Sequence, residues 1–204
     1  MALSRLRGRA AGILSWRNLM AQRVCPWWLG YLLACPLRRF AQDPAKLLAP
    51  YVREGMTVLE PGPGMGFFTL DLARLVGPSG RVVALDIEPR MLSRLKRRAA
   101  RGGLTERLDV RLASSNSLGV GDLAGVVDFS LVFGVAHELP AVEPFFAELA
   151  QASKPGAGLL LAEPVVHVKR AQFEAELQSA AKAGFVVADR PSIRRSRAAL
   201  LKKG

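Results

Sequence analysis

Residues 58–66 read Val-Leu-Glu-Pro-Gly-Pro-Gly-Met-Gly, which we interpret as a buried strand that ends on an acid and enters a glycine-rich turn. A helix is predicted to follow over residues 67–76, and a second apolar run, residues 82–85, ends on Asp86. Strand, glycine turn, helix, strand and acid form the arrangement with which an α/β sheet holds a nucleoside. Glycine lets the backbone adopt a positive φ and approach a ligand closely. The Asp86 carboxylate can accept hydrogen bonds from both ribose hydroxyls.

The spacing of the glycines separates two classes of nucleoside-binding protein. A dinucleotide-binding turn has the pattern G-x-G-x-x-G, which would place its third glycine where this chain has Phe67. The pattern here is E-x-G-x-G-x-G, and it resembles the first motif of class I S-adenosylmethionine (SAM)-dependent methyltransferases. Asp86 and the Ile-Glu-Pro-Arg-Met-Leu that follows it resemble the second motif of that family. The resemblance covers roughly residues 43–203 and disfavours an NAD-linked dehydrogenase.

The resemblance implies a set of cofactor contacts for SAM. Glu60 would orient the turn and contact the amino group of the cofactor, directly or through water, while Asp86 would hold the ribose and Ile87 would flank the adenine. The family often has an aspartate after the third strand, where this chain has Asn116. The side-chain oxygen of Asn116 can accept from the adenine amine, or the residue only caps a turn. The predicted cofactor-binding residues are Glu60, Gly62, Gly64, Gly66, Asp86, Ile87 and Asn116.

The pattern of apolar runs and turn residues predicts an α/β fold with helices on both faces of a sheet. Strands are expected over residues 57–60, 81–86, 108–112, 127–133, 159–163, 185–188 and 196–201. Helices are expected over residues 43–52, 67–76, 89–102, 142–153 and 169–183. The connection between the last two strands is too short for a helical crossover, so these strands should pair antiparallel. Seven strands with this ending match the Rossmann-like methyltransferase sheet, in the order 3-2-1-4-5-7-6 with the last strand antiparallel.

The length of 204 residues fits one such domain, residues 43–204, preceded by a basic extension, residues 1–42. Residues 25–35 form an apolar, aromatic run that is too short to cross a bilayer. It is expected to be a cap helix on the domain, a lid over the substrate pocket, or an interfacial anchor with Arg38 and Arg39 at lipid headgroups. Arg17 interrupts the preceding apolar run, which argues against a secretory signal but leaves a transit peptide or a later start at Met20 open. We therefore expect a cytoplasmic protein, with peripheral membrane contact as an alternative.

The net charge of +12 is concentrated in segments that contain no acid, notably residues 1–42 and 90–101. Such faces attract phosphate in nucleic acid or on an anionic membrane, or are simply solvated surfaces of an arginine-rich chain. No separate nucleic-acid-binding module is visible. The two cysteines, Cys25 and Cys35, are expected to be free thiols. They and the two histidines are scattered, so no metal site is predicted.

The candidate catalytic residue is His137, which follows the strand predicted at residues 127–133. In class I methyltransferases this loop lies under the sulfonium, so His137 is either a general base or a structural histidine. Glu163 and His167 follow the next strand and form a second candidate wall of the pocket. The predicted activity is methyl transfer from SAM to a small-molecule acceptor, with general resemblance to enzymes of ubiquinone and menaquinone biosynthesis. A nucleic-acid or other polyanionic acceptor, and a SAM-binding protein without catalysis, are the alternatives; the oligomeric state is left open.

Overall fold

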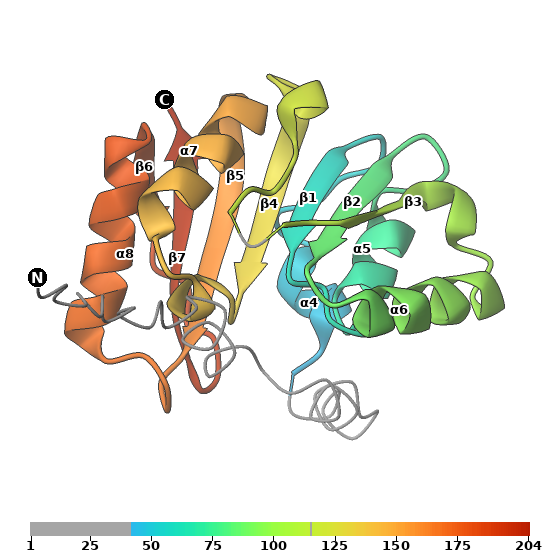
Figure 1. Ribbon diagram of the computed structural model, residues 1–204, viewed down its shortest axis with the longest axis horizontal. Helices are drawn as coiled ribbons and strands as arrows, with labels where there is room; N and C mark the ends of the chain where they lie inside the picture. The colour runs from blue at the N-terminus through green and yellow to red at the C-terminus, as the bar shows by residue number, and fades with distance from the viewer. Residues whose placement is uncertain (1–41, 115) are drawn as a thin grey trace, which may run out of the picture.

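The computed structural model describes residues 42–114 and 116–204, which form one seven-stranded sheet covered by helices on both faces (Figure 1). The order of the strands is β3-β2-β1-β4-β5-β7-β6, so the predicted fold and strand order are confirmed. The predictions made for the basic extension, including its cap helix and membrane contact, fall almost entirely outside the described residues. Within the described residues, no helix has both the length and the apolar character needed to cross a membrane.

The strands agree closely with the ranges expected from the sequence. They are β1 Thr57–Pro61, β2 Arg81–Asp86, β3 Leu108–Leu112, β4 Val127–Phe133, β5 Ser153–Pro164, β6 Phe185–Asp189 and β7 Ser196–Lys203. The α-helices are α4 Pro44–Leu48, α5 Thr69–Leu75, α6 Pro89–Arg101, α7 Val142–Ala152 and α8 Arg170–Lys182. The short 3₁₀ helices of the described residues are η1 Thr105–Arg107, η2 Gly121–Leu123 and η3 Ala136–Glu138.

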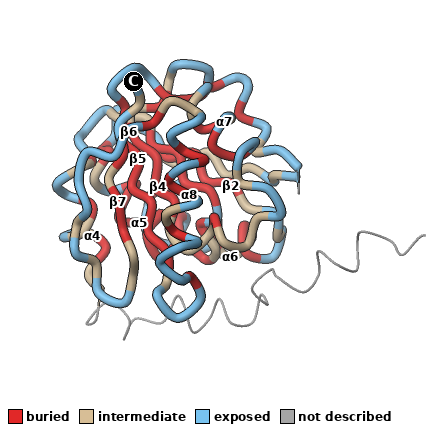
Figure 2. Tube along the Cα trace, turned by 90° about the vertical axis from the view of Figure 1, so that its left-hand side faces the viewer, coloured by how far each residue is buried: buried red, intermediate tan, exposed pale blue. Residues whose placement is uncertain are grey.

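Two hydrophobic layers cover the sheet, one on each face. Alternate residues of a strand point to opposite faces, and in β1 Val58 packs with α4, α5 and α6 while Leu59 packs with α7 and α8. The central strands are mostly buried (Figure 2), whereas β3 is only partly buried and most of β6 is exposed, at the two edges of the sheet. Because β1, β2, β4 and β5 run parallel, their carboxyl ends meet at one edge of the sheet.

β7 runs antiparallel to both of its neighbours, as the short connection predicted. Leu160 of β5 pairs with Leu200 of β7, and Val187 of β6 pairs with Leu201. The strand therefore lies inside the sheet, between β5 and β6, although it is the last strand in the described sequence.

Several predicted boundaries differ from the structure. β5 begins at Ser153 instead of Leu159, because Ser153 pairs with Val127 before the register shifts and Phe129 pairs with Gly158. The helix α4 ends at Leu48 and not at residue 52, since a proline follows at position 50 and lacks the N–H that a helix interior needs. The helix α5 begins two residues later than expected, after the glycine turn.

Candidate functional site

The glycine turn between β1 and α5 uses positive φ angles at all three motif glycines. The φ angles are +67° at Gly62, +54° at Gly64 and +82° at Gly66. A Cβ on Gly62 would lie 2.5 Å from Val135, and one on Gly66 would lie 2.5 Å from Leu95. A Cβ on Gly64 would meet no atom within 4 Å. Gly62 and Gly66 are thus required by packing inside the protein, whereas Gly64 faces open space that a side chain would fill.

Asp86 joins this turn to the one that follows β2. Its Oδ2 accepts from the backbone N–H of Gly64 at 3.2 Å, and its Oδ1 accepts from that of Glu88 at 3.0 Å. Burial raises the pKa of Asp86, although these backbone bonds oppose the rise. A carboxylate oxygen can accept more than one hydrogen bond, so both oxygens retain the capacity to bind ribose hydroxyls. The neighbouring Ile87 is 44% exposed and offers an apolar surface beside them.

Glu60 ends β1 as a buried acid, with only 3% of its surface exposed. Its Oε2 has no hydrogen-bond partner among the described residues. Burial raises its pKa to about 8, and the charge of Asp86 adds to the rise. An unpaired buried carboxylate is unfavourable, and a cationic amino group placed beside it would relieve that penalty. The open face of Gly64, the ribose-binding capacity of Asp86 and the unpaired oxygen of Glu60 fit a SAM molecule.

The glycine turn is also held by Arg98 of α6. Its Nη1 donates to the backbone carbonyl of Met65, which lies between the second and third glycines. The sequence alone did not indicate this contact, because Arg98 is one of several cations on an arginine-rich helix. The contact links a carbonyl of the turn to α6.

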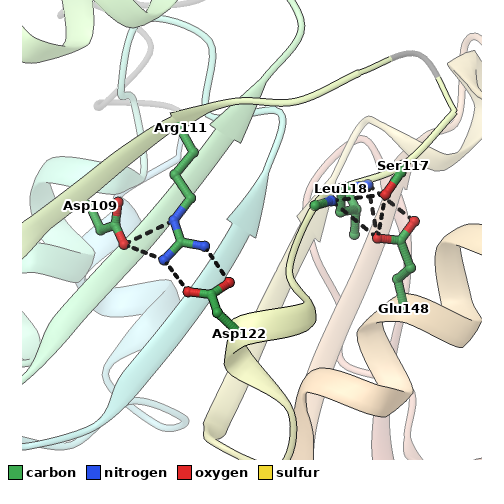
Figure 3. Close-up of polar contacts among 7 residues, drawn as sticks. Asp109, Arg111, Ser117, Leu118, Asp122 and Glu148 are labelled. Atoms are coloured by element: carbon green, nitrogen blue, oxygen red, sulfur yellow. Dashed lines mark hydrogen bonds and ion pairs between the residues drawn. The ribbon is translucent and has the colours of Figure 1, made fainter.

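The loop after β3 is fastened to α7 by an acid that sequence reasoning missed. Glu148 accepts from the hydroxyl of Ser117 at 3.0 Å and from the backbone N–H groups of Leu118 and Gly119 at 3.0 and 3.2 Å. Figure 3 shows this carboxylate under the loop and, to one side, Arg111 held between Asp109 and Asp122.

Asn116 lies in the same loop, exposed, with its backbone N–H donating to the Ser114 hydroxyl at 3.4 Å. This contact supports a role in the turn, and the contact of the Asn116 side chain with adenine stays a prediction.

His137 lies on η3, directly after β4, and is paired with Glu163 at the end of β5. The Nδ1–H of His137 donates to Oε2 of Glu163. The other oxygen of Glu163 accepts from the backbone N–H groups of Val135 at 3.2 Å and Ala136 at 2.9 Å. The bond to Glu163 raises the pKa of His137, and burial opposes the rise. With Nδ1 committed to Glu163, Nε2 is the nitrogen left to act on a ligand.

Two further side chains extend this group. The ring of His167 lies parallel to that of His137, with 5.8 Å between their centroids. Glu176 of α8 is only 3% exposed, and neither of its carboxyl oxygens has a hydrogen-bond partner among the described residues. Burial raises the pKa of Glu176 to about 7; the charge of Glu163 adds to the rise, and His137 opposes it.

The sequence does contain a pattern that indicates the burial of Glu176. It is an acid on the apolar face that Phe173, Leu177 and Ala180 define at helical spacing.

The structure thus brings the predicted residues together in two neighbouring groups. Glu60, Gly64 and Asp86 form one group at the ends of β1 and β2, while His137 and Glu163 form the other at the ends of β4 and β5. The two groups adjoin where the backbone of Gly62 faces Val135. In the part of the chain that the structure describes, no three His, Cys, Asp or Glu side chains are grouped so that they could hold a metal ion.

Comparison with known proteins agrees with this geometry. Residues 52–190 match a family described as "Methyltransferase domain". The chain is 32% identical over 145 residues to a ribosomal protein L11 methyltransferase of Pelotomaculum thermopropionicum, covering 71% of this chain and 43% of that protein. It is 30% identical over 116 residues to the ubiquinone/menaquinone biosynthesis C-methyltransferase UbiE of Brucella anthropi, covering 57% of this chain and 43% of that protein. The chain therefore spans less than half the length of these curated relatives.

Among solved structures, a SAM-dependent methyltransferase from Aquifex aeolicus is similar over almost its whole length. It superposes with a TM-score of 0.77 at 26% identity, covering 88% of this chain and 98% of that one. TrmN from Thermus thermophilus superposes with a TM-score of 0.63 at 22% identity, over 80% of this chain and 48% of that one, and so shares the fold.

Proposed function

This chain belongs to the family of SAM-dependent methyltransferases, and on that premise we propose that it methylates a small-molecule acceptor whose nucleophile binds beside His137. The observation that carries the proposal is the His137–Glu163 pair, which lies next to the glycine turn and leaves Nε2 available. The side chain of His137 is 16% exposed, so the ring can be reached from outside the core.

In this proposal one set of residues binds SAM and a second set transfers a proton. Bound SAM supplies a methyl group activated by a positively charged sulfur. Glu60 would pair with the amino group of the cofactor, and Asp86 would hold its ribose. Glu163, itself fixed by two backbone N–H groups, holds the Nδ1–H of His137 and sets the direction of the ring. Nε2 then takes the proton of an acceptor hydroxyl, amine or activated carbon as the methyl group is transferred.

A small molecule is the acceptor class that the site supports best. The residues proposed to hold SAM and the proposed base adjoin at Gly62 and Val135, which supports transfer to an acceptor held within one compact site. The similar proteins carry names that refer to a ribosomal protein and to quinone biosynthesis, and neither name by itself decides the acceptor here. A polyanionic acceptor is the second candidate, because α6 carries six cations and no acid.

An acceptor screen with labelled SAM tests the proposal. The purified protein is incubated with methyl-labelled SAM in three parallel reactions, which contain a metabolite extract, total RNA or ribosomal protein. The label incorporated into each acceptor fraction is then measured. We expect label in the metabolite fraction and none in the macromolecules, with no label from a Gly64→Val variant. Label in RNA or protein would contradict the small-molecule proposal and identify that macromolecule as the acceptor. SAM binding without turnover on any fraction would indicate a binding protein instead of an enzyme.

A further inference from the structure

The strands β4 and β5 pair irregularly near their amino ends. Val127 pairs with Ser153, and after the register shift Phe129 pairs with Gly158. Over this interval β4 advances by two residues and β5 by five, so residues 154–157 of β5 bulge out of the ladder. A bulge bends its strand and leaves residues without a partner in the ladder, and the sheet is therefore not flat at this end.

A pocket of about 520 Å³ lies at this bulge. Its walls come from the segment between α4 and β1, the beginning of β4, the bulge of β5 and the end of β7. The volume falls within the range of small-molecule sites, about 300–1,000 Å³. The pocket is thus large enough for a small organic ligand.

An aromatic ring and a cation converge on one wall of the pocket. Phe129, Gly158 and Lys202 form a row across β4, β5 and β7. A Cβ on Gly158 would lie 3.0 Å from the ring of Phe129 and 3.8 Å from Nζ of Lys202, so both side chains lean over this glycine. Tyr51 stacks on Phe129 with 5.9 Å between the ring centroids, and it is only partly buried. The pocket therefore offers an accessible aromatic side chain as well as an ammonium group.

The side chains that line the pocket carry an excess of positive charge. Its charged lining residues are Arg53, Asp128, Lys154 and Lys202. The carboxylate of Asp128 is already used within the protein: Oδ2 accepts from the backbone N–H of Thr57 at 2.8 Å, and Oδ1 pairs with Lys154. Asp128 and Lys154 thus neutralise each other, which leaves the charges of Arg53 and Lys202.

Lys202 is paired with no acid in the part of the chain that the structure describes. Its Nζ donates to the backbone carbonyl of Gly156 at 3.4 Å, and Arg53 also donates to backbone carbonyls. Asp189 is near enough for its charge to add to the effect of burial in raising the pKa of Tyr51, but it does not line the pocket. A ligand carboxylate would supply the counter-charge that Lys202 lacks.

The pocket lies at the edge of the sheet opposite the candidate methyl-transfer site, away from the arrowhead of β4 (Figure 1). On β5, Gly158 lines the pocket and Glu163 holds His137. Five residues of strand separate Gly158 from Glu163, roughly 16 Å at about 3.3 Å per residue. A ligand in this pocket would therefore be neither the cofactor nor the methyl acceptor.

We propose that the pocket at the β5 bulge is a second ligand site, which binds a small aromatic acid. The carboxylate of the ligand pairs with Lys202, with the charge of Arg53 adding to the attraction, and its ring packs against Tyr51. The site is separate from the residues that carry the proposed function, so this proposal does not depend on the identity of the methyl acceptor.

The test uses three probes that differ in one property each. Benzoate is both aromatic and anionic, cyclohexanecarboxylate keeps the charge without the aromatic ring, and benzylamine keeps the ring with the opposite charge. Each is titrated into the full-length protein, with and without SAM, and backbone amide shifts are followed by NMR. The shift map of the wild type locates the site without any substitution.

Two variants remove the same charge from neighbouring positions of β7. Lys202→Gln removes the pocket cation. Lys203→Gln is the matched control, because successive residues of a strand point to opposite faces and Lys203 does not line the pocket.

We expect benzoate to shift the amides of Gly156 and Gly158 and not that of Gly64, whether or not SAM is present. Lys202→Gln should weaken benzoate binding about tenfold or more, the scale of a hydrogen bond to a charged group, while Lys203→Gln should leave it close to wild type. Equal losses in both variants would show diffuse attraction to a basic surface and overturn the proposal. Shifts confined to other residues, or binding of benzylamine or cyclohexanecarboxylate as tight as that of benzoate, would overturn it as well.

Discussion

At the end of β2 the carboxylate of Asp86 is held by backbone N–H groups, whereas at the ends of β4 and β5 the carboxylate of Glu163 bonds both to backbone N–H groups and to a histidine side chain. Asp86 accepts from the backbone of Gly64 and Glu88, and the turn around it depends on glycine conformations that few other residues adopt. His137 and Glu163, by contrast, are two titratable side chains that share a hydrogen bond.

Both groups contain a buried carboxyl with a raised pKa, Glu60 at about 8 and Glu176 at about 7, but only the second contains a histidine bonded to a carboxylate. The first group is built around the glycine turn, whose positive φ angles few other residues adopt. The second group includes Glu176, whose pKa of about 7 places a change of charge in the neutral range. We therefore expect substitutions in the first group to affect cofactor affinity and substitutions in the second to affect rate and pH dependence.

The largest effect should come from a side chain on Gly64. Gly64→Val should abolish SAM binding, because a β-branched side chain at φ +54° strains the turn and fills its open face. No atom lies within 4 Å of the new Cβ, so the packing of the core should be largely kept. Gly66→Ala is the matched variant: its Cβ would lie 2.5 Å from Leu95 and should lower the melting temperature first. Calorimetry with SAM and thermal melting by circular dichroism check both results. Normal SAM binding by folded Gly64→Val would show that the turn does not face the cofactor.

His137→Ala should lower kcat by about 10²–10⁴-fold with SAM affinity unchanged, the usual share of general acid–base catalysis. The rate of the wild type should rise with pH through a value above 6.5, since the Glu163 bond raises the pKa of His137 and only the neutral ring can take a proton.

His137→Gln is the control, because it can hydrogen-bond but cannot act as a base. Once an acceptor is known, steady-state rates measured across pH distinguish a general base from a residue that only orients the substrate. A His137→Gln rate close to wild type would assign the residue to orientation of the substrate.

Asp86→Ala should weaken SAM binding by about 1.5–3 kcal/mol, the range for hydrogen bonds to a charged group. Part of the loss would come from the released N–H groups of Gly64 and Glu88, which now bond to the carboxylate. Asp86→Asn keeps an acceptor and should retain more of the affinity. Dissociation constants for SAM and for a ribose-free analogue, methionine, distinguish the contributions: the loss should be seen with SAM and be small with methionine.

The last prediction concerns the pH dependence of stability. Glu60 and Glu176 have pKa values raised to about 8 and about 7, while their unfolded values stay near the ordinary value of 4.5. Between these limits the folded state holds protons that the unfolded state has released, so the free energy of unfolding should fall as pH rises. Each raised carboxyl contributes at most about 1.4 kcal/mol per pH unit.

Two neutral variants assign the effect to one group of residues or the other. Glu176→Gln should flatten the fall up to about pH 7, and Glu60→Gln should flatten it up to about pH 8. Urea unfolding at several pH values measures both. An unchanged pH dependence in both variants would mean that neither carboxyl is held protonated in the folded protein.

The fold was predictable because most helices and strands have a recognisable local sequence pattern. β2 and β4 are apolar runs bounded by turns, and their predicted limits are confirmed. The start of β5 was not predictable, because Lys154, Pro155 and Gly156 read as a turn, and only pairing with β4 draws Ser153 into the strand.

In the candidate site, too, some residues were predictable from local sequence and others were not. The glycines and Asp86 stand out at fixed spacing from the end of a strand. Glu148 and Arg98 act on loops about 30 residues away in the sequence, and no local pattern connects such partners. Their roles follow only from the three-dimensional packing of α7 and α6 against those loops.

The position of β7 also determines when the sheet can be completed during synthesis. In the described sheet β6 reaches β5 only through β7, so β6 must wait until residues 196–203 have emerged from the ribosome. Throughout that interval the twelve-residue strand β5 is an open edge of the sheet, and open edges recruit other strands. A nascent chain that stalls within β6 would expose this edge, which makes such fragments targets for aggregation, chaperones and proteases.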